Sequence, residues 1–161
     1  MKKYLSSSLA RMNMIEIRAH HLLCIPRFYR GGYDEVFAAN MKEVCTYIRK
    51  HPDTEIKVIV AEPDVLCMEC SHRDGVTCVQ SKKIGLWVVE QDKKVLIYLG
   101  LQKDSVHKAK DLFNLSVEKV NEETIHDVCK GCIFLKNCIK VGVNKLFVKD
   151  LNKDVRVRIS S

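Results

Sequence analysis

The sequence contains no long apolar segment, and this absence excludes two broad classes of protein. No apolar run approaches the ~20 residues that a helix needs to cross a bilayer. The first residues, MKKYLSSSLARMNM, begin with a basic pair but lack the apolar stretch of a secretory signal. Neither a membrane protein nor an exported one is expected, so the predicted location is the cytoplasm.

Sequence motifs of common cofactor-dependent enzymes are also missing. The chain has no G-x4-G-K-[ST] loop, no Rossmann glycine fingerprint and no C-x3-C-x2-C motif of a radical-generating cluster site. It has no internal repeat long enough for a solenoid and no low-complexity segment. These absences give an enzymatic function little support and favour a protein without substrate chemistry of its own.

What remains is the composition of an ordinary globular domain. The 161 residues are 47% hydrophobic and 29% charged, which is enough chain and enough apolar surface for one core. A strand-like run opens at Met14, so residues 1–13 are predicted to be an N-terminal extension. Residues 14–161 are predicted to form a single cysteine-rich metal-binding domain that ends in a basic tail.

The positive charge of the chain is concentrated near its C-terminus. The formal net charge is +7, and residues 129–161 hold eight Lys or Arg but only two Asp. One interpretation is a nucleic-acid-binding surface. The simpler interpretation is that Lys130, Lys136 and Lys140 offset the negative charge of neighbouring thiolates.

Periodicity predicts an α+β fold, a single compact helix-rich domain with a few short strands and two cysteine-rich metal-binding loops. Apolar residues recur at helical spacing over residues 34–50 and 106–128, and a weaker pattern favours a helix in the second half of 87–100. Strands are predicted at 15–18, 55–61 and 155–159, and the cysteine loops at 67–78 and 129–138.

Six of the eight cysteines fall into two triads. The first triad is Cys67-x2-Cys70-x7-Cys78 and the second is Cys129-x2-Cys132-x5-Cys138. A C-x-x-C step lets two thiolates converge on one metal, and zinc sites and iron–sulfur clusters usually take four such ligands. Two C-x-x-C pairs among polar loop residues therefore indicate metal binding rather than buried structural thiols.

Each triad is one ligand short of four, which directs attention to the segment His20-His21-Leu22-Leu23-Cys24. Cys24 is the preferred fourth ligand for one triad, with a buried thiol as the alternative. His20 and His21 are further candidate ligands, but histidines in such positions more often donate hydrogen bonds to a ligand or pack in the core. Cys45 lies on the apolar face of the predicted 34–50 helix and is predicted to pack in the core.

The opening R-A-H-H-L-L-C, the G-G-Y that follows, the D-V-L-C-x-x-C loop and the V-C-K-G-C ending resemble a known family. This is an uncharacterised prokaryotic domain-of-unknown-function family with an HHLLC opening motif, commonly labelled iron–sulfur or metal binding. The resemblance extends from about Met14 to Cys138, with Ala19 where members often have proline. It implies that the cluster residues are Cys24, Cys67, Cys70, Cys78, Cys129, Cys132 and Cys138.

Two functions are therefore expected to compete. The first is an iron–sulfur protein, of unspecified cluster type, that transfers electrons or senses redox state with a redox partner protein. The alternative is a zinc-stabilised interaction module that binds nucleic acid through the basic C-terminal region. An enzyme that uses the cluster or a C-x-x-C dithiol is the third and least supported possibility. The sequence gives no indication of the oligomeric state.

Overall fold

The computed structural model describes residues 14–28, 35–61, 64–66, 73–74, 77–78, 87–130, 132 and 135–153. Three sequence predictions therefore lie outside the described residues: the extension at 1–13, the strand at 155–159, and the placement of Cys67 and Cys70. Cys78 is described only as part of a two-residue strand.

A small three-stranded sheet forms one side of the molecule. Strand β1 (Met14–Arg18) pairs in parallel with β2 (Glu55–Ile59), with Met14 opposite Glu55 and Arg18 opposite Ile59. Strand β5 (Val106–Lys108) pairs antiparallel to β2, which gives the order β1-β2-β5. A separate short hairpin pairs β3 (Arg73–Asp74) with β4 (Thr77–Cys78).

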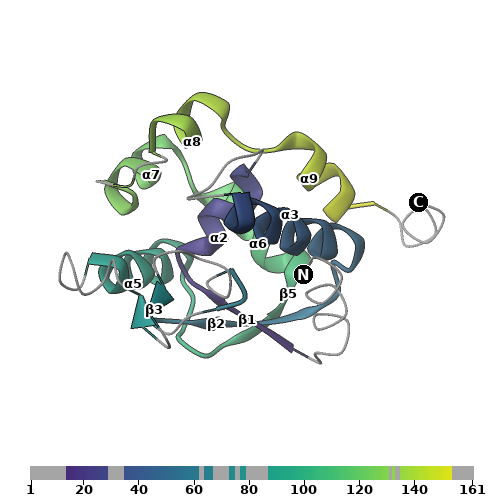
Figure 1. Cartoon of the computed structure of the whole chain (residues 1–161), viewed down its shortest axis with the longest axis horizontal. Coiled ribbons are helices and arrows are strands. Elements are labelled where there is room, and N and C mark those ends of the chain that lie inside the picture. Colours follow the sequence, from purple (N-terminus) through teal and green to yellow (C-terminus); the bar gives the residue numbers. More distant parts are fainter. Residues whose placement is uncertain are drawn as a thin grey trace.

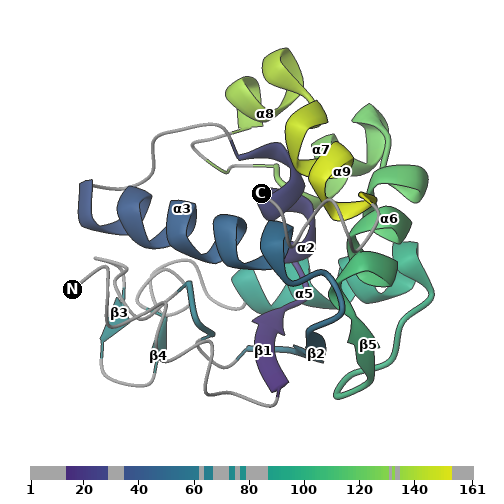
Figure 2. The same cartoon turned by 90° about the vertical axis from the view of Figure 1, so that its right-hand side faces the viewer.

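Helices cover one face of this sheet in two levels (Figure 1). The level next to the sheet holds α2 (His21–Cys24), the 3-10 helix η1 (Ile25–Arg27), α3 (Glu35–Lys50) and α6 (Ala109–Lys119). The level farther from the sheet holds α7 (Glu122–Val128), α8 (Leu135–Val141) and α9 (Lys145–Leu151). Helix α5 (Trp87–Leu99) packs beside them against α6 and α7. Figure 2 shows the same two levels from the side.

The hydrophobic core fills the space between the sheet and these helices. Ile15 and Ile17 of β1 and Ile56 of β2 are fully buried, as the alternation of a strand with one covered face requires. The outer helices join this core through the edge-to-face pair Phe113 and Phe147, whose ring centroids lie 5.6 Å apart. The core therefore connects all three levels of the fold.

The observed elements confirm most of the predicted ones and correct two. The predicted strand at 15–18 and the helix at 34–50 are present, and the ambiguous segment 87–100 is helical almost throughout. The single helix predicted over 106–128 is wrong at both its start and its middle. Val106 belongs to β5, and the helix breaks at Val120–Asn121, where Asn121 accepts a hydrogen bond from the Thr124 N–H and begins α7. Cys138, predicted in a loop, lies on α8.

Candidate functional site

The candidate site is built around α2, which follows directly from the carboxyl end of β1. Leu22 and Leu23 point into the core, and the Ser116 hydroxyl donates a 2.7 Å hydrogen bond to the Leu22 carbonyl. Because these leucines face inward, the polar residues of the helix, His20, His21 and Cys24, are left half-buried at its two ends. Pro26 then converts the following turn into the 3-10 helix η1.

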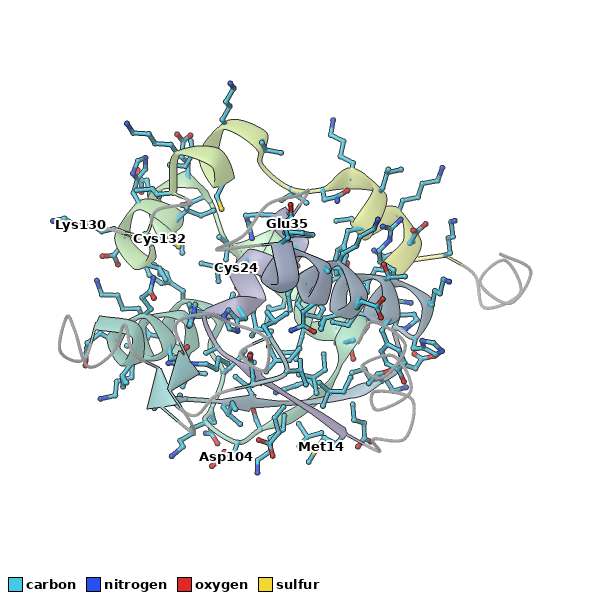
Figure 3. All side chains as sticks on the ribbon, viewed as in Figure 1. Met14, Cys24, Glu35, Asp104, Lys130 and Cys132 are labelled. Carbon is cyan, nitrogen blue, oxygen red and sulfur yellow. The ribbon has the colours of Figure 1, made fainter. Side chains whose placement is uncertain are left out.

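Four cysteines act on one another electrostatically near the C-terminal end of α2, and we call them the thiol group. They are Cys24, Cys129, Cys132 and Cys138. Burial raises the pKa of Cys24 well above its usual range, and the other three cysteines raise it further. Burial likewise raises the pKa of Cys129 to about 12, with Cys132 and Cys138 adding to the effect. Figure 3 labels Cys24 on α2 and Cys132 between α7 and α8.

Backbone turns present the thiol group from three separate segments. The Cys129 N–H donates to the Ile125 carbonyl at the end of α7, at 2.8 Å. The Cys132 N–H then donates to the Cys129 carbonyl at 2.8 Å, which closes the turn of the C-x-x-C pair. Cys138 follows on α8, so the second triad bends around the end of α2 that holds Cys24.

A buried guanidinium stands among these thiols. Arg27 is 5% exposed, and its Nη1 donates a 2.9 Å hydrogen bond to the Leu23 carbonyl. Burial lowers the pKa of Arg27, whereas Cys24, Cys138 and Cys129 act in the opposite direction. In the part of the chain that the structure describes, no Asp or Glu forms an ion pair with Arg27. Among the described residues, the groups whose charge acts on Arg27 are Cys24, Cys138 and Cys129.

The described residues contain no ready-made metal site. Within the described ranges, no three His, Cys, Asp or Glu side chains come together closely enough to hold one metal ion. The thiol group is therefore defined by the electrostatic action of its cysteines on one another and not by a shared coordination centre.

The two histidines occupy the opposite end of α2. His20 Nδ1 lies 2.7 Å from an oxygen of Asp92, and His21 Nδ1 lies 2.6 Å from an oxygen of Asp64. The charges that act on His20 come from His21, Asp92 and Arg18, and none of them acts on Cys24. Both histidines are thus tied to carboxylates at one end of the helix, while the thiol group lies at the other.

Of the remaining sequence candidates, Cys45 lies in the core, and two of the others lie outside the described residues. Cys45 is 7% exposed inside the core, where its thiol points at the Ile25 carbonyl at 3.8 Å, so the prediction of a core cysteine is confirmed. Burial raises the pKa of Cys45 to about 12, and no cysteine contributes to that shift. Of the first triad, Cys67 and Cys70 lie outside the described residues.

Three charged residues of this region were missed by the sequence analysis. Arg27 could have been found, because it is a lone charge in the apolar run Leu22–Phe28, three residues after Cys24. Asp64 and Asp92 carry no comparable pattern. Asp92 meets Arg18 across 74 residues of chain, a contact that no local motif encodes.

No helix in the described part of the chain combines the length and apolar character needed to span a membrane. No curated protein and no solved structure matches the chain significantly. One family model matches residues 32–138, a range that contains both cysteine triads and begins after Cys24. The model is described as "Protein of unknown function (DUF1284)", and because it covers more than half of the chain, this protein belongs to that family.

Proposed function

We propose that this protein binds an iron–sulfur cluster through Cys24, Cys129, Cys132 and Cys138, and that it transfers electrons or senses redox state. The observation that carries the proposal is the thiol group itself. Cys24 lies more than 100 residues before the other three cysteines in sequence, yet all four gather near the end of one helix, with a buried cation among them. Four thiolates are the usual ligand set of [2Fe–2S] and [4Fe–4S] clusters.

The charge balance of the thiol group favours a bound metal over four free thiols. Burial raises the pKa values of Cys24 and Cys129, so as free thiols they are neutral at pH 7. Among the described residues, no carboxylate would then offset the buried charge of Arg27, and an uncompensated buried charge destabilises the fold. A coordinating metal deprotonates its thiols outright, and the resulting thiolates supply the missing negative charge.

The surroundings of the thiol group suit one-electron exchange. A cluster supplies an electron-transfer centre whose potential depends on net charge, on hydrogen bonds to sulfur and on solvent exposure. Arg27 places a fixed positive charge beside the thiolates and thereby favours the reduced, more negative state. Lys130, Lys136 and Lys140 lie exposed on the segment that carries the second triad, where a negatively charged redox partner could approach.

Anaerobic purification with iron, zinc and acid-labile sulfide analysis tests this proposal directly. We expect a brown protein that contains iron and sulfide in comparable amounts. Cys24→Ala should lose most of this iron, because it removes a ligand. Cys45→Ala is the matched control, since it makes the same truncation in the core, and it should keep full iron content at a cost of about 1 kcal/mol of stability.

Two outcomes would contradict the proposal. A colourless protein with stoichiometric zinc and no sulfide would replace the cluster with the zinc-stabilised module, and nucleic-acid binding would then be the next property to measure. Full iron content in Cys24→Ala would show that Cys24 is a packed thiol and would remove α2 from the site.

A further inference from the structure

His20 and His21 form a second group of side chains with its own supporting residues. Their rings are in contact, with centroids 4.2 Å apart and planes inclined at 53°. Each ring directs Nδ1 at a different carboxylate, His20 at Asp92 and His21 at Asp64. The proposal below concerns this pair of imidazoles, and it does not depend on the cluster proposed at the thiol group.

Both carboxylates are fully buried and held by several donors. Asp92 accepts hydrogen bonds from the Arg18 guanidinium at 2.9 and 3.1 Å and from the Ala61 N–H at 3.0 Å. Asp64 accepts from the backbone N–H groups of Arg18 at 2.8 Å and Leu66 at 2.9 Å. The orientation of each carboxylate is therefore fixed before it meets its histidine.

These contacts determine which tautomer each imidazole adopts. The carboxyl of Asp92 has a pKa below its usual range: burial alone would raise it, but His20, Arg18 and the Ala61 N–H lower it. An ionised carboxylate only accepts hydrogen bonds, so Nδ1 of His20 must donate. The same geometry at Asp64 makes His21 Nδ1 a donor. In its neutral form each ring then carries its lone pair on Nε2.

Nε2 of each ring has no hydrogen-bond partner among the described residues, and the two side chains remain 14% and 13% exposed. Burial and the neighbouring His21 lower the pKa of His20, which keeps that ring neutral near pH 7. A neutral imidazole presents a lone pair, which attracts a cation and not an anion.

The position of the pair in the fold also suits a ligand site. His20 and His21 follow the carboxyl end of β1, and Ala61 and Asp64 follow the carboxyl end of the parallel strand β2. In α/β sheets ligands bind outside the carboxyl ends of parallel strands. Ala61 adopts a left-handed φ of 72°, unusual for a residue with a side chain, and in this conformation its N–H reaches Asp92.

We propose that Nε2 of His20 and Nε2 of His21 bind a divalent transition-metal ion of the Zn²⁺, Co²⁺ or Ni²⁺ class. A ring whose Nδ1–H donates to a carboxylate while Nε2 faces outward is the arrangement that metal-ligating histidines adopt. Imidazole nitrogen suits these borderline ions. In the described part of the chain no third ligand joins the two rings, so positions remain open for water or for a substrate.

Cobalt binding to the full-length protein tests this proposal. The key variant is His20→Asn/His21→Asn, because the Asn amide retains a donor where Nδ1–H stood but removes Nε2. We expect the wild type to bind one more equivalent of Co²⁺ than this variant, measured by dialysis and elemental analysis. His51→Asn is the control, since His51 is exposed and binds the Tyr47 carbonyl, and it should match the wild type.

Further variants separate this site from the thiol group. Asp64→Asn should weaken cobalt binding by about 10- to 100-fold through lost orientation of His21. Cys132→Ala should lose metal bound by the thiol group yet retain the histidine-bound cobalt. Failure of the cluster proposal would leave this cobalt unchanged, so the two proposals fail independently.

A measurement on the wild type alone tests the proposal even if the variants misfold. On addition of Zn²⁺ the ¹⁵N resonances of Nε2 in His20 and His21 should shift, while Nδ1 keeps the chemical shift of a protonated nitrogen. Unchanged Nε2 resonances would overturn the proposal, as would equal cobalt stoichiometry and affinity in the wild type and a folded double-Asn variant.

Discussion

At the scale of single residues, Arg18 and Asp92 form the most deeply buried Arg or Lys ion pair among the described residues. Both side chains are at most 1% exposed, and the closest contact is 2.9 Å. Asp92→Asn preserves the shape of the side chain but removes its charge from beside the guanidinium. Breaking one partner of a buried pair costs roughly 3–5 kcal/mol, so we expect a loss of that size in the free energy of unfolding by urea.

The control for this experiment is a pair of the same kind on the surface. Lys94 lies 2.8 Å from Asp127, and both side chains are more than 40% exposed. Solvent screens such a pair, so Asp127→Asn should change the unfolding free energy far less than Asp92→Asn does. Similar losses in both variants would show that burial does not amplify the Arg18–Asp92 interaction.

At the scale of elements, a salt bridge fastens α9 to α3. Arg49 donates through Nε at 2.8 Å and through Nη2 to Asp150, and Lys153 lies 2.9 Å from the other oxygen of Asp150. Burial alone would raise the pKa of Asp150, but the hydrogen bonds from Lys153 and Arg49 lower it. Asp150 is therefore more acidic in the folded protein than in the unfolded chain.

The sign of this shift determines how the contact depends on pH. A depressed carboxyl pKa contributes stability above the unfolded value of about 3.9, and the contribution is lost as pH falls through the folded value. We therefore expect Asp150→Asn to melt below the wild type at neutral pH. The difference in Tm should shrink as the pH falls below about 4. A difference that stays constant down to the acid limit would contradict the prediction.

At the scale of the whole molecule, the thiol group takes its cysteines from both the inner and the outer level of helices. Cys24 is the last residue of α2, the helix that follows β1 of the sheet, whereas Cys129, Cys132 and Cys138 belong to the α7–α8 region. The proposed ligands are not preassembled in the unfolded chain, so binding of the proposed cluster would add to the free energy of folding. Anaerobic removal of that cluster with a chelator should therefore lower the Tm of the wild type.

The same treatment of variants identifies the ligands. Cys24→Ser should already have a lowered Tm, nearly as low as that of Cys132→Ser, and the chelator should lower neither much further. A Cys24→Ser protein whose Tm still responds fully to the chelator would show that the metal does not connect α2 to the outer helices.

The sequence by itself determined the elements whose patterns are local. The helix at α3 follows from apolar residues spaced three and four apart, because such a face is buried whatever covers it. The strand at β2 follows from its β-branched run. Sequence also singled out Cys24 and both cysteine triads as chemically special, since grouped cysteines are uncommon without a metal or a disulfide.

Only the tertiary structure decided which of these residues meet. Periodicity placed Val106 on a helix, but in the structure it belongs to β5 and pairs with Lys57 of β2. Pairing with a neighbouring strand overrides the local preference of the sequence. The packing of α7 and α8 places the second triad beside Cys24, more than 100 residues away in sequence. The aspartates that orient His20 and His21 come from 72 and 43 residues away. Contacts over such distances form only when the core brings the elements together, because no local pattern encodes the position of a distant partner.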